Sequence, residues 1–206
     1  MPRPSASQPA ARDRILACAS DLFYRKGINH VGINEIIGAS GIARMTLYHH
    51  FASKNDVIVA VLERRMAERR QAMQAVMEAA HSPRDKVMAA FGYLRDLVGA
   101  DAFRGCVFIN AAVELADPSH PGAVLSAQHK QRMADGFARI ADDAGWPDAA
   151  GFGLQCQLLW DGAVAAAQLN YTAAAVDAAC QAVGVLIAAR ESAARPGPDR
   201  TAKGAS

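Results

Sequence analysis

Apolar residues recur at helical spacing along nearly the whole chain, and no segment shows the sustained period-two alternation of a β-strand. A first amphipathic helix is indicated by five residues on one stripe: Ile15, Leu16, Ala19, Leu22 and Phe23. Gly27 follows Arg25 and Lys26 and is predicted to end this helix. The pattern as a whole predicts an all-α protein of about nine helices.

Longer helices occupy the part of the chain after residue 52. Ser53 and Asp56 form a capping box that begins the first of them, and Pro83 begins the next. The remaining ones are predicted over residues 105–116, 124–144, 149–169 and 173–190. No uninterrupted apolar run approaches the roughly 20 residues that a membrane-spanning helix needs, so membrane spanning is not expected.

Two short segments ahead of Ser53 are joined by a glycine turn. Helices are predicted over Ile33–Ala39 and Ala43–His50, and Gly41 between them supplies the positive φ of a tight turn. Three apolar residues are assigned to hold the two helices at an angle: Ile36, Ile42 and Leu47. This order of elements predicts a helix-turn-helix.

The second short helix carries side chains suited to double-stranded DNA on its outer surface. Arg44 can fork onto guanine, while Met45 and the methyl group of Thr46 can contact thymine. Donors to phosphate oxygens are supplied by three further residues: Tyr48, His49 and His50. Lys54 lies beside the free amides that begin the next helix and completes an anion clamp. The helix is therefore a candidate for entry into a major groove.

The charge distribution supports this prediction only weakly by itself. Residues 1–75 hold 11 Lys and Arg against 6 Asp and Glu, whereas the rest of the chain holds 11 against 14. A solvated helix face gives a similar basic excess, and each polar residue taken singly could belong to an ordinary wet surface. A metal site at His49 and His50 is disfavoured because neighbours in a helix project about 100° apart.

The stretch Gly41–Lys54, GIARMTLYHHFASK, resembles the DNA-binding motif of the TetR/AcrR family of transcriptional regulators. The family pattern runs glycine, a small hydrophobic residue, variable residues, Thr-Leu-Tyr, two polar or aromatic residues, phenylalanine and then Ser-Lys. The resemblance implies a DNA-binding domain over about Arg12 to Val61, with Leu47 and Phe51 in its core. It implies these DNA contacts: Asn34, Arg44, Met45, Thr46, Tyr48, His49, His50 and Lys54.

Gly32 and Ala43 depart from the family pattern, which often has a hydroxyl N-cap at both positions. Both short helices should therefore be less firmly capped, by up to about 1 kcal/mol for the alanine. The predicted organisation is a disordered arm over residues 1–10, a helix-turn-helix DNA-binding domain over 11–55, a helical effector-binding and dimerisation domain over 56–191, and a disordered tail over 192–206.

The segment RGCVFINAAVELADPSHPG resembles the effector domain of one TetR subgroup, in which a Gly-Cys-x-x-x-Asn-Ala-Ala stretch lies beside an internal pocket. The resemblance implies a small, largely apolar effector. The candidate ligand-binding residues are Phe91, Cys106, Phe108, Asn110, Glu114, Gln157, Trp160 and Asp161. For the aromatic residues among them, the sequence pattern would be the same if they belonged to the hydrophobic core and contacted no ligand. The polar ones are costly to bury alone and could instead find partners within the protein.

The last two long helices are rich in alanine and other small residues. Small side chains allow helices to approach closely, so two such helices and their symmetry mates are expected to form a four-helix bundle. A homodimer with two recognition helices would then face an inverted repeat in DNA.

Four cysteines are scattered along the chain: Cys18, Cys106, Cys156 and Cys180. Their spacing matches neither zinc sites nor a disulfide framework, so reduced and mostly buried thiols are expected. A redox-sensing role for Cys106 is the alternative.

These features together predict a ligand-responsive transcriptional repressor that binds a palindromic operator as a dimer and is released by its effector. Activation by the same fold is an alternative, and a helical enzyme or structural dimer without DNA binding is a further one. The sequence has no nucleotide-binding glycine fingerprint, no G-x-S-x-G elbow and no H-x-x-x-H pair, so no catalytic residue, metal site or cofactor is predicted. The first residues lack the apolar stretch of a secretory signal, which predicts a cytoplasmic protein.

Overall fold

The computed structural model describes residues 10–170 and 173–195, and every regular element in this part of the chain is an α-helix. The helices are α1 (Ala11–Lys26), α2 (Ile33–Ser40), α3 (Arg44–His50), α4 (Lys54–Glu78), α5 (Pro83–Val98), α6 (Val107–Leu115), α7 (Pro121–Asp143), α8 (Ala149–Asn170) and α9 (Ala174–Ala194). The all-α prediction is thus confirmed. The predicted arm up to residue 9 and the predicted tail from residue 196 lie outside the described residues.

The signals that delimit the early helices act as the sequence predicts. Gly27 ends α1 with φ +90°, and its N–H donates to the Phe23 carbonyl at 2.9 Å. Gly41 ends α2 in the left-handed region with φ +62°. No side chain caps the start of α2 or α3, as expected from Gly32 and Ala43.

Two capping boxes begin longer helices. The Ser53 N–H donates to an oxygen of Asp56 at 2.8 Å, and the Asp56 N–H donates to the Ser53 hydroxyl at 3.2 Å. At α5 the Ser82 hydroxyl accepts from the Asp85 N–H at 3.1 Å, with Pro83 in the first turn. Both arrangements satisfy amides that a helix start leaves without intrahelical partners.

Two helix ends differ from the sequence prediction by more than two residues. Helix α7 begins at Pro121 and not near Val124, because a proline is well tolerated in the first turn of a helix, where its missing N–H is not needed. The Gly122 N–H of that turn donates to His120 Nδ1 at 3.0 Å. Helix α9 continues to Ala194, so Ser192–Ala194 of the predicted tail are helical.

The chain packs as two compact units. Among the described residues, the first contains residues 10–69 together with Cys106–His129, and the second contains Arg70–Gly105 together with residues 130–170 and 173–195. Helices α4 and α7 therefore contribute residues to both units. The sequence predicted a boundary at residue 55 between a DNA-binding domain and an effector-binding domain, and this division by function stays a prediction. The compact units are divided at other positions.

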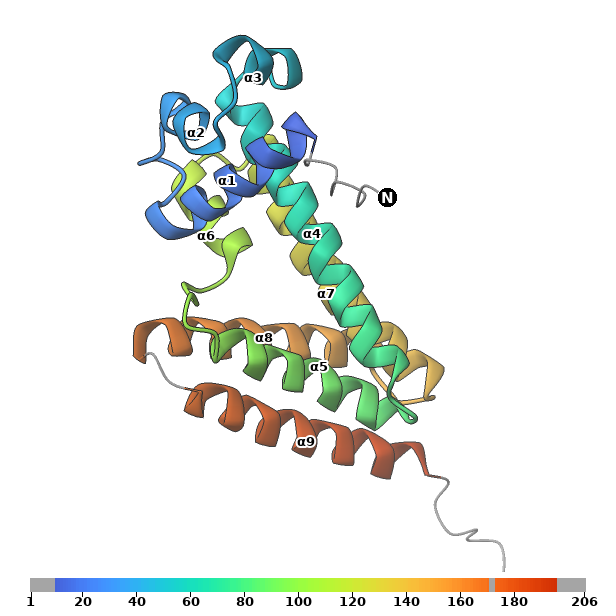
Figure 1. Ribbon diagram of the computed structural model, residues 1–206. Helices are drawn as coiled ribbons and strands as arrows, with labels where there is room; N and C mark the ends of the chain where they lie inside the picture. The colour runs from blue at the N-terminus through green and yellow to red at the C-terminus, as the bar shows by residue number, and fades with distance from the viewer. Residues whose placement is uncertain (1–9, 171–172, 196–206) are drawn as a thin grey trace, which may run out of the picture. The chain divides into compact units, whose positions relative to one another are not determined.

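The first unit has a core built from helices that are distant in sequence. Leu16 of α1, Leu47 of α3 and Ile58 of α4 are each at most 2% exposed. Phe108 and Ala111 of α6 belong to the same apolar cluster, so α6 is a structural part of this unit. Figure 1 shows α6 beside α1.

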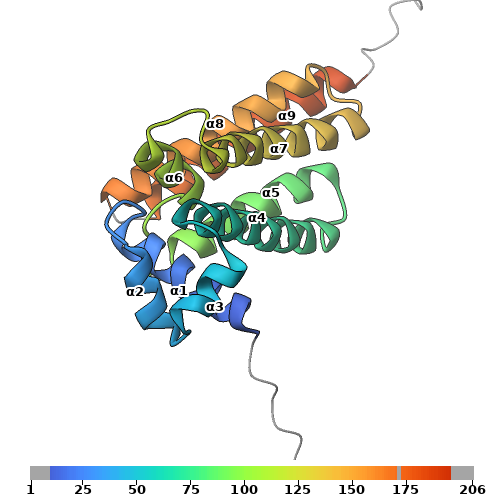
Figure 2. The same ribbon diagram turned by 90° about the horizontal axis from the view of Figure 1, so that it is seen from above.

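The second unit is a layered arrangement of long helices. Helices α5, α8 and α9 run side by side in Figure 1, and each packs against the other two. Figure 2 shows α7 alongside α8. Phe91, Phe137, Phe152 and Ile187 are fully or almost fully buried in its interior. At Gly153 of α8 a Cβ would lie only 2.3 Å from the Ala134 carbonyl oxygen, so α7 and α8 are in close backbone contact there.

The four cysteines are free, but burial is less general than expected. Only Cys156 is buried, whereas the other three are half-buried. The expectation of mostly buried thiols is therefore wrong for Cys18, Cys106 and Cys180, which lie at the margins of the apolar faces of their segments. Burial raises the pKa of Cys156 to about 12, and the charge of Arg190 acts in the opposite direction.

We expect Cys156 to resist alkylation in the folded protein, because the thiolate is the reactive form and a pKa near 12 keeps the thiol protonated. Native protein should be treated with iodoacetamide at about pH 8 and the modified cysteines located by peptide mass spectrometry. Half-buried Cys106 is the internal control. Equal rates of modification at both cysteines without denaturant would contradict the burial described for Cys156.

Candidate nucleic-acid interface

The turn between α2 and α3 is fixed by α1 as well as by its own glycine. The Arg14 guanidinium of α1 donates from Nη2 to the Ser40 carbonyl at 2.7 Å and lies 3.4 Å from the Gly41 carbonyl. Ile42, the next residue, is 8% exposed and joins the core. Carbonyls at the end of a helix lack intrahelical partners, so a cation at this position stabilises the end of α2. Arg14 was not identified from the sequence, since this contact joins residues far apart in the chain.

Helix α3 has one buried side and one open side. Leu47 is completely buried and Phe51, directly after the helix, is 4% exposed, as the family resemblance implied for core positions. Met45 is 78% and Tyr48 41% exposed. Arg44, His49 and His50 are also exposed, while Thr46 is half-buried. The side chains predicted to contact DNA on this helix thus lie on its open side, with Thr46 at the edge.

Asn34 contacts Arg44 at the N-terminus of α3. The Arg44 Nη2 donates to the Asn34 side-chain oxygen at 2.6 Å, and both residues are exposed. The contact joins α2 to α3 across the turn. Because one amino group of the guanidinium is held, the directions in which its remaining donors point are restricted.

Lys54 is held by the protein more firmly than the sequence suggests. Its ammonium donates to the Ile28 carbonyl at 2.6 Å, and the residue is half-buried. An ammonium has three donors, so this bond does not by itself prevent contact with an anion. The Asp56 N–H, however, is taken by Ser53. The predicted anion clamp at the start of α4 therefore lacks one of the amides counted for it.

Arg12 is a further cation near α3 that sequence reasoning did not single out. Its guanidinium carbon lies 5.5 Å from the centre of the Phe51 ring, in a cation–π arrangement. His50 also approaches Phe51, with ring centres 6.4 Å apart, and His49 contacts His50 edge to face. The end of α3 thus gathers an exposed arginine and two histidines around a buried phenylalanine.

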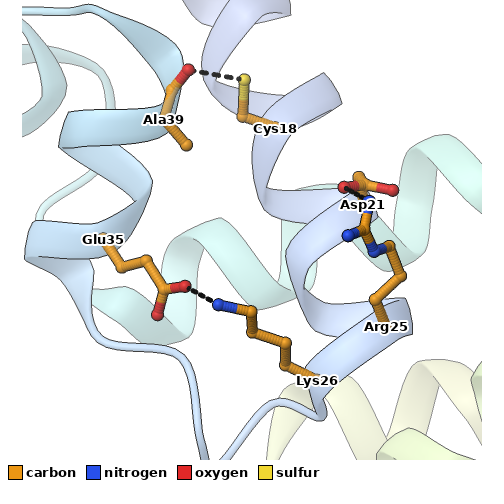
Figure 3. Close-up of polar contacts among 6 residues, drawn as sticks. All are labelled: Cys18, Asp21, Arg25, Lys26, Glu35 and Ala39. Carbon is orange, nitrogen blue, oxygen red and sulfur yellow. Dashed lines mark hydrogen bonds and ion pairs between the residues drawn. The ribbon is translucent and has the colours of Figure 1, made fainter.

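Helices α1 and α2 are joined by polar contacts along their length (Figure 3). Lys26 pairs with Glu35 at 2.5 Å, and the Cys18 thiol donates to the Ala39 carbonyl at 3.5 Å. The third contact drawn, Arg25 with Asp21, lies within α1 at 3.4 Å. The two contacts between the helices are individually weak, and both join α2 to α1.

Both the sequence and the fold of this chain are similar to those of known proteins. Residues 15–61 match the model of the bacterial regulatory proteins of the tetR family. A TetR-family transcriptional regulator from Streptomyces coelicolor has a similar structure, with 30% sequence identity, a TM-score of 0.83, and coverage of 87% of this chain and 95% of that chain. The chain belongs to the TetR family.

Among curated relatives, the transcriptional activator FasR of Mycolicibacterium smegmatis is 28% identical over 44% of this chain and 42% of its own length. The transcriptional repressor NemR of Escherichia coli is 26% identical over 52% of this chain and 55% of its own length. The chain thus spans about half the length of the curated relatives it matches.

Helix α6 of this TetR-family chain is hydrogen-bonded to the turn between α1 and α2. The Asn29 N–H donates to a carboxylate oxygen of Glu114 at 3.1 Å, and the Asn29 side-chain amide donates to the Glu114 carbonyl at 2.7 Å. A Cβ on Gly27 would come within 2.8 Å of the same carboxylate. Glu114 therefore has a partner within the protein, which was one of the alternatives for the polar residues of apolar helices.

The residues predicted to bind a ligand divide between the two compact units. Cys106, Phe108, Asn110 and Glu114 belong to the first, and Phe91, Gln157, Trp160 and Asp161 to the second. Within the first, the Phe108 ring stacks on His129 with centres 3.8 Å apart. Within the second, Gln157 and Asp161 are hydrogen-bonded and Phe91 contacts Trp160. Their assignment to a ligand stays a prediction.

Across the described ranges, 10–170 and 173–195, no group of three or more His, Cys, Asp or Glu side chains is arranged to hold a metal ion. Within the same ranges, none of the helices combines the length and apolarity that crossing a bilayer requires.

We expect Glu114→Ala to lower the free energy of unfolding by about 1 kcal/mol, because it removes the acceptor of the Asn29 N–H. Glu114→Gln retains an acceptor oxygen and should lose less. Urea denaturation followed by circular dichroism measures both, with exposed Glu63→Ala on α4 as the control. A loss at Glu114 no larger than that at Glu63 would show that the contact does not stabilise the turn.

Proposed function

We propose that this TetR-family protein is a homodimeric transcriptional repressor that binds an inverted-repeat operator and leaves it when a small, largely apolar effector binds. The observation that carries the proposal is the two-sided character of α3. Its buried side is anchored by Leu47, and its open side presents Arg44, Met45 and Tyr48. A helix fixed in this way can enter a major groove without losing its own support.

The roles of the open side chains follow from their chemistry. Arg44 is assigned to base recognition because a forked guanidinium matches the two acceptors of guanine. Asn34 is assigned a second role besides DNA contact, since its oxygen holds Arg44 at 2.6 Å and so limits the directions that Arg44 can take. Contacts to phosphate are assigned to Tyr48, His49, His50 and Lys54, with Met45 and Thr46 against base edges.

Exposed and mostly apolar residues, which recur along one side of each of the last two helices, support dimerisation. Five exposed residues of α8 recur at spacings of three and four: Leu154, Leu158, Gly162, Ala165 and Leu169. Five exposed residues of α9 do the same: Ala174, Ala178, Gln181, Val185 and Ala188. Leu158 is 62% and Val185 70% exposed, which is unusual for large side chains repeated along one helix face. A second copy of the chain covers this surface in the proposed four-helix bundle.

Activation is a second candidate because of the relatives. FasR is described as an activator and NemR as a repressor, and both are similar to this chain over about half of its length. The sign of regulation depends on where the operator lies relative to the promoter. A reporter driven by the promoter next to a footprinted operator, with and without the regulator, distinguishes the two.

We expect Arg44→Ala to weaken binding to the operator by about 1–3 kcal/mol and to leave binding to unrelated duplexes nearly unchanged. Asn34→Ala should lose part of the same discrimination, since it releases Arg44. Lys54→Gln should instead weaken binding to all duplexes and lower the salt slope by about one. Fluorescence anisotropy over a range of salt concentrations gives all three quantities.

Arg84→Ala removes an equal charge from the exposed surface of α5 and serves as the control for the loss of one cation. The operator must first be obtained by selection from random duplexes. If Arg44→Ala weakens operator and unrelated duplexes equally, Arg44 does not read bases. If the wild-type protein selects no sequence and binds no duplex at low salt, the proposed function is wrong.

We expect Leu158→Arg to convert the dimer to a monomer, because it places a charge among the exposed, mostly apolar residues of α8. Sedimentation velocity measures the mass in solution. Val113→Arg makes the same kind of change at a 72% exposed residue of α6, outside the last two helices, and should leave the dimer intact. A dimer that survives Leu158→Arg would place the interface elsewhere.

A further inference from the structure

A charged pair lies between α7 and α8 in the second unit. The Lys130 ammonium donates to one oxygen of Asp161 at 2.5 Å. The side chains of the two residues are 18% and 27% exposed. A charge at such a position needs a partner, and each supplies it for the other. The pair is electrically neutral as a whole.

Gln157 extends this pair into the interior. The residue is 5% exposed, and its side-chain nitrogen donates to the second oxygen of Asp161 at 2.7 Å. Its side-chain oxygen is buried, and among the described residues it has no hydrogen-bond partner. Most buried polar side-chain atoms in folded proteins do have one, so this oxygen requires a specific explanation.

The orientation of the Gln157 amide is fixed by the carboxylate. If the amide turned over, its oxygen would face the Asp161 oxygen, and two acceptors cannot share a hydrogen bond. Lys130 in turn fixes Asp161 by binding its other oxygen. The free position of Gln157 is therefore an acceptor, and only a donor can satisfy it.

Aromatic rings occupy the same unit. Phe91 is completely buried and contacts the Trp160 ring edge to face, with centres 5.8 Å apart. The centre of the Phe137 ring of α7 lies 6.0 Å from the centre of the Phe91 ring. Trp160 follows Gln157 by three residues on α8, and residues three apart lie on the same side of a helix. Flat apolar surface and a single oriented acceptor thus come from one helix face.

We propose that the Gln157 oxygen anchors the effector, and that the effector is an uncharged, largely apolar molecule with a hydroxyl or N–H donor. The inference rests on the proposed function, because it assumes that an effector binds at all. An anion is disfavoured because it would face a carbonyl oxygen. A cation is disfavoured because it would lose its hydration among aromatic rings while the Asp161 carboxylate is already neutralised by Lys130.

The test uses matched pairs of compounds that differ in one donor: thymol with its methyl ether, carvacrol with its methyl ether, and indole with N-methylindole. Isothermal titration calorimetry on the purified full-length protein measures each affinity. In each pair the donor-bearing compound should bind the wild type about tenfold more tightly. Gln157→Met keeps the side-chain length and removes the acceptor, so the preference should fall to about unity.

Gln128→Met makes the same change at an exposed position of α7 and should keep the full preference. Asp161→Asn keeps Gln157 but allows its amide to turn, so the methylated compounds should gain affinity relative to their partners. Altered packing around residue 157 does not predict that gain. Circular dichroism establishes that each variant is folded.

Binding of the donor-bearing compounds with a preference lost in Gln157→Met supports the inference. Absence of binding by all six compounds, equal affinities within the pairs, or a preference retained in Gln157→Met overturns it, and the partner of this oxygen is then solvent. Duplex binding measured on the same protein without any compound separates this failure from failure of the regulator proposal.

Discussion

The candidate DNA-binding surface depends on the burial of one leucine. Helix α3 has only seven residues, and a helix of that length is not stable by itself in water. It persists because Leu47 is completely buried in the core that also contains residues of α1 and α4, and because Phe51, directly after the helix, is only 4% exposed. The open side of α3 contributes little to this stability. The polar residues on this side can therefore vary without loss of the helix. A small helix needs this property if its side chains are to recognise a particular DNA sequence.

Local signals account for the parts of the fold that the sequence predicts well. Gly27, Gly41 and the pair Ser53 and Asp56 act within a few residues of the chain, so their effect is visible without knowledge of the fold. The helix-turn-helix and the family follow from such signals. The same holds for the exposed side of α3, because helical periodicity fixes which positions accompany Leu47. Pro121 was predicted to break a helix, but it begins α7, since proline can do either depending on its position.

Contacts between distant residues could not be predicted in the same way. Lys54 holds the Ile28 carbonyl and Arg14 holds the end of α2, and both pairs are separated by 26 positions in the chain. Nothing near either cation in the sequence indicates its partner. For the polar residues of the apolar helices, the cost of burial predicted that partners exist but not which ones. The structure shows that Asp161 accepts hydrogen bonds from Lys130 and Gln157, and that Glu114 accepts one from the Asn29 N–H.

The contact between Asn29 and Glu114 has a consequence for protein engineering. Chimaeric regulators are assembled by joining the N-terminal segment of one protein to the remainder of another. A junction placed anywhere between residues 30 and 113 leaves Asn29 and the glycine at 27 with one parent and Glu114 with the other. A foreign α6 without a glutamate at this position would then leave the Asn29 N–H without its carboxylate partner. Grafts that also carry the α6 segment of the donor parent would preserve this junction.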